Sequence, residues 1–323
     1  MAGKQIVATL LLISILSGSA YAERLRGTVS LDGSSTVFPI SEAVAEEFLA
    51  VQPRVRVTVG VSGTGGGFKK FLAGETDIND ASRPIKTREI KFAHDKDIGF
   101  IELPVAYDGL SLVVNKKNDW VDYLTVAELR KIWQPGSSVT NWSDIRTGWP
   151  RQKIRLYGPG TDSGTFDYFT ETINGKSGAS RPDYTASEDD NTLVQGVSGD
   201  LNSLGYFGFA YYEANKDKLK LVAIDRGDGP VLPGPTTINN GTYAPLSRPI
   251  FVYIRKSALD RPEVMAFARF YLSNAAILAS EVGYIPLPDF VYEKAIRRIE
   301  RRETGTAYHH NVELNAANLL ATQ

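Results

Sequence analysis

Apolar residues recur along this chain with two periods, one typical of strands and the other of helices. Between residues 55 and 61, valine alternates with polar residues or glycine, which predicts a strand. Ile40, Val44 and Phe48 recur at helical spacing behind Pro39, and proline suits the first turn of a helix. Further strands are predicted at 110–115, 154–157, 206–210, 220–224 and 250–254, and helices at 126–132, 165–173, 262–272 and 291–301. This alternation indicates an α/β protein.

The length of the chain allows two ordinary domains. It has 323 residues, 42% of them hydrophobic, which is enough for a substantial core. A loop-rich stretch at 227–249 holds many of its prolines and glycines and separates two structured regions. We expect this stretch to lie before a return crossing of the chain between the domains.

The first 22 residues have the pattern of a secretory signal peptide. A basic start at Lys4 is followed by an apolar run at 6–16 and by small residues that end at Ala22, after which we expect cleavage. A retained membrane anchor is disfavoured, since the apolar run is shorter than the roughly 20 residues that a spanning helix needs. The pattern therefore predicts an exported protein.

The lack of cysteine and the scarcity of histidine limit the available chemistry. Without cysteine there is no disulfide, no thiol nucleophile, and no cysteine to carry a lipid anchor behind the signal peptide. His94, His309 and His310 are the histidines, and the last two lie in the polar C-terminal segment. We predict a soluble periplasmic protein with no metal site and no cofactor.

The overall charge is close to neutral. There are 36 basic and 37 acidic residues, for a formal net charge of -1. No overall field therefore favours binding of nucleic acid or of an anionic membrane surface. An anionic ligand would have to be held by local groups.

Three stretches share a pattern in which glycine, serine and threonine precede an apolar helical segment. They are DGSSTVFP at 32–39, SGTGGG at 62–67 and GPGTDSGTFDYF at 158–169. A helix N-terminus leaves backbone N–H groups unpaired, glycine allows close approach to them, and hydroxyls add hydrogen bonds. Each stretch alone is most simply an ordinary helix cap. Together they favour a site for a small anion.

Arg83, in the segment ASRP at 81–84, could add a guanidinium to this set. A guanidinium presents a planar fork of donors that matches phosphate or carboxylate oxygens, although a surface ion pair would equally explain the residue. No Walker lysine follows the glycines. The set therefore favours a small tetrahedral oxyanion over a long phosphorylated cofactor.

The triplet Asp162-Ser163-Gly164 also invites an interpretation as the nucleophile of a hydrolase. That chemistry needs a histidine base near Ser163, but His94 lies in a charged segment and the other histidines lie in the tail. A GxSxG elbow is also missing. A secreted serine hydrolase or phosphatase that uses Ser163 remains the alternative function. A secreted structural or adhesion protein is a third class, but it would not explain the three stretches.

The chain resembles the periplasmic phosphate-binding proteins of Pst-type ABC transporters, the PstS family. The resemblance runs over nearly all of the mature chain, in the family's order, and is carried by DGSSTVFPISEAVAEEF, VSGTGGGFKKFLAGETDINDASRPI, LTVAELRKIW with NWSDI, GTDSGTFDYF, and GYFGFAYY with PLSRPIFVYI. It implies a two-lobed type II periplasmic binding protein fold. Each lobe is then a mixed sheet flanked by helices, with the ligand in the interlobe cleft. Lobe I would comprise residues 27–106 plus 249–323, and lobe II residues 107–248.

The resemblance also implies a function and a set of site residues. The expected function is high-affinity binding of inorganic phosphate by hinge closure, and its delivery to the permease of an ABC transporter with an associated ATPase. The protein would be a monomer and not an enzyme. The implied phosphate-binding residues are Ser35, Thr36, Val37, Phe38, Thr64, Ser82, Arg83, Asp162, Ser163, Gly164 and Thr165.

Two positions depart from the well-known enteric form of the family. In that form an aspartate follows the serine of the Ala-Ser segment, and an arginine lies four residues before the serine of Ser-Gly-Thr. Arg83 and Pro159 stand at these positions here. We therefore expect Arg83 to provide the main charge pairing. A carboxylate that accepts the proton of hydrogen phosphate would select against sulfate, and Asp162 is the first choice for it, with Asp80 and Asp32 as alternatives.

Overall fold

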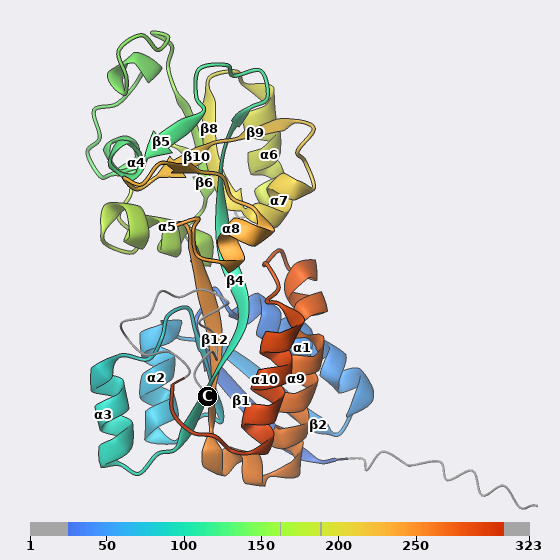
Figure 1. Cartoon of the computed structure of the whole chain (residues 1–323). Coiled ribbons are helices and arrows are strands. Elements are labelled where there is room, and N and C mark those ends of the chain that lie inside the picture. Colours follow the sequence, from blue (N-terminus) through green and yellow to red (C-terminus); the bar gives the residue numbers. More distant parts are fainter. Residues whose placement is uncertain (1–24, 162, 188, 307–323) are drawn as a thin grey trace, which may run out of the picture.

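The fold divides into two halves that share a pair of long strands. The structure is a computed structural model that describes residues 25–161, 163–187 and 189–306. In Figure 1 a lower and an upper half are joined by β4 (Phe100–Asn115) and β12 (Ser247–Arg255). No helix within the described ranges is long and apolar enough to cross a membrane.

The lower half is a sheet with helices on both faces. Its strands follow the order β2-β1-β3-β12, in which the first three are parallel: β1 (Gly27–Gly33), β2 (Val55–Val61) and β3 (Ile78–Ala81). Helices on one side of this sheet in Figure 1 are α1 (Phe38–Val51), α9 (Pro262–Glu281) and α10 (Asp289–Glu300). Those on the other side are α2 (Gly63–Ala73) and α3 (Thr87–Asp95).

The apolar spacing that predicted the first helix explains how this helix packs. Ile40, Val44 and Phe48 are all buried. The Phe48 ring lies 5.3 Å from the rings of both Phe267 and Phe270 in α9. Burial of these side chains against α9 fixes α1, and with it the loop that precedes α1, over the end of the sheet.

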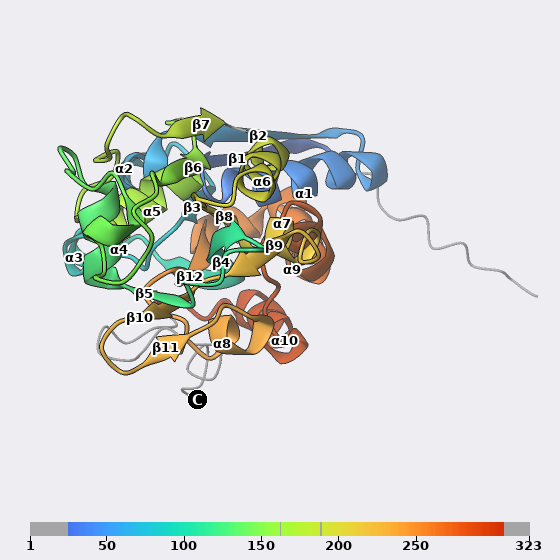
Figure 2. The ribbon, with the colours of Figure 1, turned by 90° about the horizontal axis from the view of Figure 1, so that it is seen from above.

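The upper half contains the other end of the large sheet and a small separate one. The large sheet continues from β4 through β8 (Ser203–Gly208), β6 (Arg155–Pro159) and β7 (Thr185–Ser187), and β9 (Leu219–Leu221) also pairs with β4. The small sheet lies beside it in Figure 2 and consists of β5 (Tyr123–Thr125), β10 (Ala223–Asp225) and β11 (Pro230–Val231).

The helices of the upper half pack on an aromatic core. They are α4 (Val126–Trp133), α5 (Gly164–Asn174), α6 (Asp190–Gly199), α7 (Phe209–Glu213) and α8 (Pro235–Asn239). Phe169 of α5 stacks on Tyr206 with 3.8 Å between ring centroids, and Trp133 meets both rings edge-on. This packing holds α5 at the edge of the upper half that faces the lower half (Figure 1).

The two long strands pair with each other where they pass between the halves. β4 and β12 are antiparallel and in register from Ser247 opposite Gly109 to Arg255 opposite Phe100, with one irregularity at Ile250 and Phe251. Every residue of β4 is buried. Beyond this pairing, β4 turns to β8 and β9 in the upper half. A single strand therefore belongs to the sheets of both halves.

Most of the predicted elements are confirmed, and three are corrected. The strand expected at 206–210 ends at Gly208, and Phe209 begins α7. The strand expected at 220–224 is two strands, β9 and β10, that lie in different sheets, because the chain passes from one sheet to the other at Val222. The expected loop at 227–249 contains β11, α8 and the first residues of β12. Alternation of residue types does not reveal such a change of partner.

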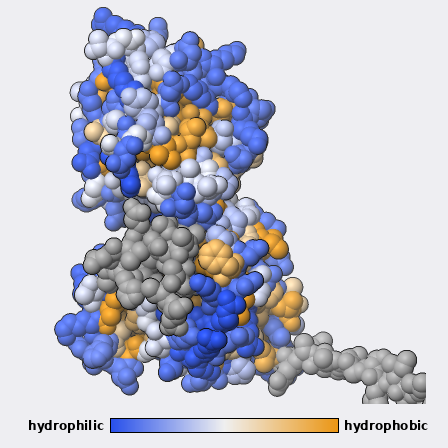
Figure 3. Space-filling model, in the orientation of Figure 1, coloured by the Kyte–Doolittle hydropathy of each residue, from blue (hydrophilic) through white to orange (hydrophobic). Residues whose placement is uncertain are grey.

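The face of the protein seen in Figure 3 is mostly hydrophilic, with apolar residues in separate patches. Large apolar side chains that are about half exposed or more in the described part of the chain include Ile277 at 62%, Val51 at 55% and Leu49 at 53%. Scattered apolar residues of this kind are ordinary on a protein surface.

Candidate anion-binding cleft

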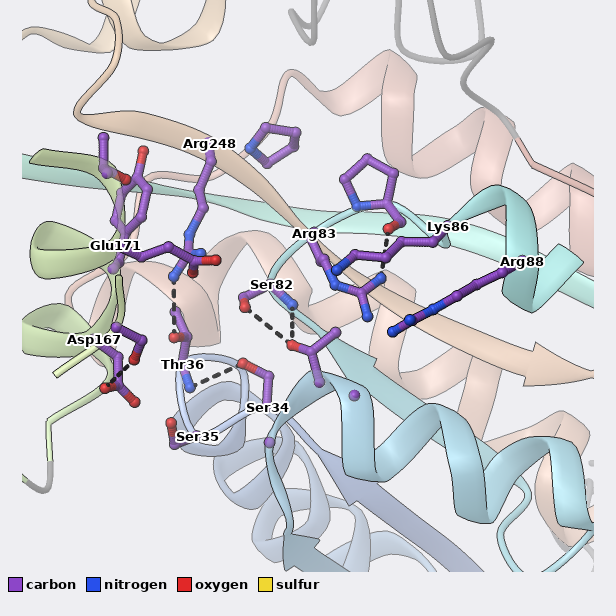
Figure 4. Close-up of a pocket in the computed structure, with 18 residues that line it drawn as sticks. Ser34, Ser35, Thr36, Ser82, Arg83, Lys86, Arg88, Asp167, Glu171 and Arg248 are labelled. Carbon is purple, nitrogen blue, oxygen red and sulfur yellow. Dashed lines mark hydrogen bonds between the residues drawn. The ribbon is translucent and has the colours of Figure 1, made fainter. Parts of the chain in front are cut away.

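A cleft of about 560 Å³ separates the two halves, and several polar loops meet at it. Figure 4 shows its lining, which comes from both halves and from β12. From the lower half it takes Ser34, Ser35, Thr36, Gly63, Thr64, Gly65, Ser82, Arg83, Pro84, Lys86 and Arg88. From the upper half it takes Asp167, Tyr168, Glu171, Thr172 and Ser177, and from β12 it takes Arg248 and Pro249.

The first of the three predicted stretches forms a tight turn before α1. The Ser34 hydroxyl accepts a hydrogen bond from the Thr36 N–H at 3.2 Å, and the Ser34 carbonyl accepts one from the Phe38 N–H at 3.0 Å. The Tyr284 hydroxyl donates to the Thr36 carbonyl at 2.5 Å. Val37 is buried just before α1, so a ligand would meet its backbone and not its side chain. The turn thus presents Ser35 and Thr36 to the cleft.

The second stretch and the Ala-Ser segment come together although they are distant in sequence. The Thr64 and Ser82 hydroxyls lie 3.0 Å apart, and the Ser82 N–H donates to the Thr64 hydroxyl at 3.1 Å. Thr64 lies in the first turn of α2, and Ser82 directly follows β3. The order of the parallel strands brings both to the same edge of the sheet, where the carboxyl ends of strands commonly hold ligands.

The third stretch begins α5 and lies against the first, although Ser163, Gly164 and Thr165 are not among the residues that line the cleft. The Ser163 hydroxyl accepts a hydrogen bond from the Thr165 N–H at 3.2 Å and therefore caps this helix. Gly164 lies so close to Thr36 that a β-carbon on it would stand 2.7 Å from Oγ1 and 3.0 Å from the backbone nitrogen of Thr36. The N-termini of α1 and α5, one from each half, therefore face each other in near contact.

Arg248, which sequence reasoning missed, is the cation at the floor of the cleft. It stands opposite Asp108 in the pairing of β12 with β4, and its Nε lies 3.5 Å from the Asp108 carboxylate. Its Nη2 donates to the Thr36 hydroxyl at 3.3 Å, and its guanidinium lies over the Tyr168 ring of α5, 3.7 Å from the centroid. The Nε is buried and has no hydrogen-bond partner in the described chain. Arg248 therefore reaches both halves, and its contact with Asp108 is long, with Nε and Nη2 each 3.5 Å from the carboxylate.

A signal for Arg248 was available in the sequence. Ser-Arg-Pro-Ile occurs twice, at 82–85 and at 247–250, and the structure brings both arginines to the cleft. The expectation from the sequence concerned only the first. The second arginine becomes recognisable as a site residue only when β12 is known to cross between the halves.

Arg83 lines the cleft but already has a partner. Its two terminal nitrogens donate to the two oxygens of Glu89 at 2.9 and 2.8 Å, and its guanidinium lies 5.2 Å from the centre of the Phe68 ring. Burial disfavours the ionised form of Glu89, but the hydrogen bonds from Arg83 and from the Lys86 N–H, together with the charges of both residues, outweigh it, so the pKa of this carboxyl is lower than usual. This short, two-pronged ion pair with Glu89 neutralises much of the charge of Arg83. The contact of Arg248 with Asp108 is longer, at 3.5 Å, so more of the charge of Arg248 is available to a ligand.

The carboxylates that sequence analysis considered have different surroundings. Asp162 lies outside the described residues. Asp32 is bonded to Lys70 at 2.6 Å and accepts from the Ser62 hydroxyl, and Asp80 is completely buried. The carboxylates that line the cleft in the described chain belong to Asp167, which accepts from the Ser177 hydroxyl at 2.6 Å, and Glu171.

The two walls at the mouth of the cleft carry side chains of opposite charge. Lys86 and Arg88, at the start of α3, lie on one side, and Asp167 and Glu171 of α5 lie on the opposite side (right and left in Figure 4). The side chains of Lys86, Arg88 and Glu171 make no ion pair in the part of the chain that the structure describes. An entering anion therefore meets the cations of Lys86 and Arg88 on one wall.

The hydrolase interpretation finds no support in the geometry around Ser163. His94 lies in α3 with 88% of its side chain exposed, and it is not among the residues that line the cleft. His309 and His310 lie outside the described residues. The Ser163 hydroxyl takes part in a helix cap, which is the simpler role considered for it.

Comparisons with known proteins agree with this architecture. The family model described as "PBP superfamily domain" matches residues 18–275. Protein SphX of Synechococcus elongatus is 50% identical over 308 residues, which cover 93% of this chain and 91% of that protein. The phosphate-binding protein PstS of Staphylococcus haemolyticus is 39% identical over 281 residues, 86% of each chain.

A solved structure is similar over the same region. The crystal structure of "a possible phosphate binding protein" from Planctomyces limnophilus is 51% identical, covers 86% of this chain and 99% of its own, and superposes with a TM-score of 0.83. The expected fold, a type II periplasmic binding protein with a mixed sheet and helices in each half, is confirmed. The chain belongs to the PBP superfamily and, within it, to the family of the phosphate-binding protein PstS.

Proposed function

We propose that this protein binds inorganic phosphate in the cleft and delivers it to the permease of an ABC transporter, driven by an associated ATPase. The observation that carries the proposal is the meeting of the loops at the starts of α1 and α2 with Arg248 at one cleft, where the start of α5 packs against Thr36. Backbone N–H groups, hydroxyls and one guanidinium suit a small tetrahedral anion. The name of the Staphylococcus relative, a phosphate-binding protein, supports the same ligand.

Binding would close two lobes around the anion. The proposed lobes are residues 27–106 plus 249–323 and residues 107–248, and the paired strands β4 and β12 would form the hinge. A ligand that touches Thr36 on one lobe and the start of α5 on the other binds the closed state better than the open one. The near contact of Gly164 with Thr36 supports such a closed arrangement.

We expect a soluble periplasmic monomer, released by cleavage of a signal peptide at 1–22, which lies outside the described residues. We expect no catalytic turnover, since Ser163 caps α5 and His94 is exposed on another element. The proposed ligand groups, besides Arg248, are Ser35, Thr36, Val37, Phe38, Thr64, Ser82, Arg83, Asp162, Ser163, Gly164 and Thr165.

Calorimetry of the purified mature protein tests the function directly. Titration with inorganic phosphate should give saturable binding of one anion per chain, and incubation with a chromogenic phosphate ester should release no product. X-ray scattering should record a smaller radius of gyration with phosphate than without it. Hydrolysis that is lost in Ser163→Ala would instead support the enzyme, and a lack of phosphate binding would refute the receptor.

Asp162→Asn should narrow the preference for phosphate over sulfate. An ionised carboxylate accepts the proton of hydrogen phosphate but repels sulfate, which has no proton to donate, and an amide does not discriminate in this way. Competition calorimetry with sulfate measures the change. Glu171→Gln is the matched variant on the acidic wall of the cleft. If Asp162→Asn leaves selectivity unchanged and Glu171→Gln narrows it, the role belongs to Glu171.

The double variant Lys86→Ala/Arg88→Ala should slow phosphate association. Free cations at the mouth raise the local concentration of an anion and accelerate its capture, by about tenfold or more at low ionic strength. Stopped-flow measurement of the association rate at low and high salt checks this. The control is Lys91→Ala, which removes an exposed cation of α3 that is paired with Asp95 at 2.7 Å. Equal association rates and salt dependence in the double variant and the parent would contradict the role.

A further inference from the structure

Asp80 is a buried carboxyl directly behind the first binding loop. It lies in β3, next to Gly33 of β1, and its backbone carbonyl accepts a hydrogen bond from the Ser34 N–H at 3.0 Å. Its side chain is completely buried, and neither of its oxygens has a hydrogen-bond partner in the described chain. An ionised carboxylate that is buried without partners raises the free energy of the folded protein, so burial favours the protonated form of this group.

The groups that face this carboxyl do not neutralise it as an anion. The Ser41 hydroxyl of α1 favours its ionised form, but that hydroxyl lies 3.0 Å from the hydroxyl of Tyr271 in α9 and is shared with it. Asp32 of β1 adds a like charge, although Lys70 of α2 is bonded to Asp32. The carboxyl of Asp80 therefore faces the carboxylate of Asp32 and the hydroxyls of Ser41 and Tyr271. Among the described residues no cation forms an ion pair with it.

An anion held by the first loop and an ionised Asp80 would both be stabilised by the same partial positive charge at the start of α1. The loop leads into α1, whose N-terminus carries a partial positive charge. Ser41, the polar neighbour of Asp80, lies near the start of this helix. The partial positive charge of the helix N-terminus therefore stabilises a negative charge on Asp80 as well as one on a ligand at Thr36. Two negative charges near one helix start repel each other, and protonation of one relieves the repulsion.

We propose that Asp80 is a proton-binding group coupled to the cleft, so that anion binding is accompanied by uptake of a proton at this carboxyl. The proposal rests on the anion binding proposed above. Coupling is reciprocal: if an anion favours protonated Asp80, then protonated Asp80 favours the anion by the same factor. The affinity for an anion then depends on pH through a residue that does not touch the ligand.

The direction of the pH effect follows from the ionisation of Asp80. Burial, followed by the charge of Asp32, raises its pKa from 3.8 to about 7, against the effect of Ser41. A bound anion raises the pKa further. At pH values below the pKa of Asp80 in both the free protein and the complex, Asp80 is protonated with or without ligand, so the affinity for the anion does not change with pH through this group. As pH rises above about 7, the free protein loses this proton before the complex does, and affinity falls by up to about tenfold per pH unit until the pKa of the complex is passed.

Calorimetric proton counting on the mature protein tests the proposal. Phosphate is titrated at about pH 7.5 in buffers of different ionisation enthalpy, which gives the protons taken up per anion bound. The Asp80→Asn variant should take up fewer protons than the parent, and its affinity should fall less between about pH 7 and pH 9. Phosphate itself titrates in this range, but its contribution is common to parent and variant and cancels in their difference. Asp217→Asn, a change at an exposed aspartate, is the matched control and should equal the parent.

A second measurement covers the case in which Asp80→Asn does not fold. Infrared difference spectra of the parent should show a protonated-carboxyl band that grows when phosphate is added above pH 7. Equal proton uptake in parent and Asp80→Asn, or the lack of such a band in the parent, overturns the coupling while phosphate binding stands. A lack of phosphate binding by the parent overturns the proposed function and the coupling together.

Discussion

Arg248→Gln lowers the affinity for phosphate by about 3–5 kcal/mol, or more than about a hundredfold, because a largely buried anion loses its main charge partner. Only 16% of the Arg248 side chain is exposed, so solvent screens the interaction poorly. Its buried Nε lacks a hydrogen-bond partner in the described chain, and Thr36 and Tyr168 hold the guanidinium between the halves. Calorimetric titration with phosphate measures the loss.

The other arginine at the cleft serves as the comparison. Arg83→Gln should cost less affinity than Arg248→Gln, since the guanidinium of Arg83 is held by two hydrogen bonds to Glu89. Arg155→Gln, at an exposed arginine of the upper half, should leave binding unchanged. If Arg83→Gln abolishes binding and Arg248→Gln does not, then the sequence-based expectation for Arg83 is correct and Arg248 is not the main cation.

Loss of stability must be separated from loss of binding in this experiment. Arg248→Gln leaves the buried Asp108 carboxyl without its cation. Burial already raises the pKa of Asp108 despite Arg248, so the carboxyl will bind a proton more readily in the variant. The double variant Arg248→Gln/Asp108→Asn should regain thermal stability without regaining phosphate affinity. Recovery of both would mean that the single change acted through the fold.

Gly164→Ala weakens phosphate binding by about 1–3 kcal/mol, because the added methyl group holds the two halves apart. Its β-carbon would meet Oγ1, Cα and the backbone nitrogen of Thr36 at 2.7 to 3.0 Å. Backbone atoms cannot move aside as the end of a flexible side chain can, so the start of α5 must withdraw from the first loop. The same change should reduce the compaction that X-ray scattering records on addition of phosphate.

The control for this change is a glycine with free space around it. At Gly199, the last residue of α6, an added β-carbon would meet nothing within 4 Å in the described chain, so Gly199→Ala should bind and close like the parent. Thermal denaturation without phosphate should be nearly unchanged for both variants, since the open state tolerates the methyl group. Wild-type affinity in Gly164→Ala would mean that the near contact with Thr36 is not required for binding.

The individual binding loops were predictable because their signals are local. A helix that follows glycine, serine or threonine is recognisable from a few residues, and the structure confirms helices at all three stretches. The second helix begins earlier than expected, at Gly63, so that residues 63–67 belong to α2 and do not precede it. The charge arrangement was less predictable. An ion pair such as Arg83 with Glu89 depends on side-chain directions at the start of α3, and these do not follow from residue types alone.

By itself the sequence determined the α/β class, the three loops and the family motifs, because strand and helix periods and helix starts are short-range properties of the chain. Only the tertiary structure decided that Arg248 lines the cleft and touches both halves. Arg248 is separated from Asp108 by 140 residues and from Thr36 by 212 residues, and it meets them because β12 crosses between the halves in register with β4. Burial of Asp80 was decided in the same way, since α1, α9 and β1 enclose it only after the lower sheet and its helices have packed.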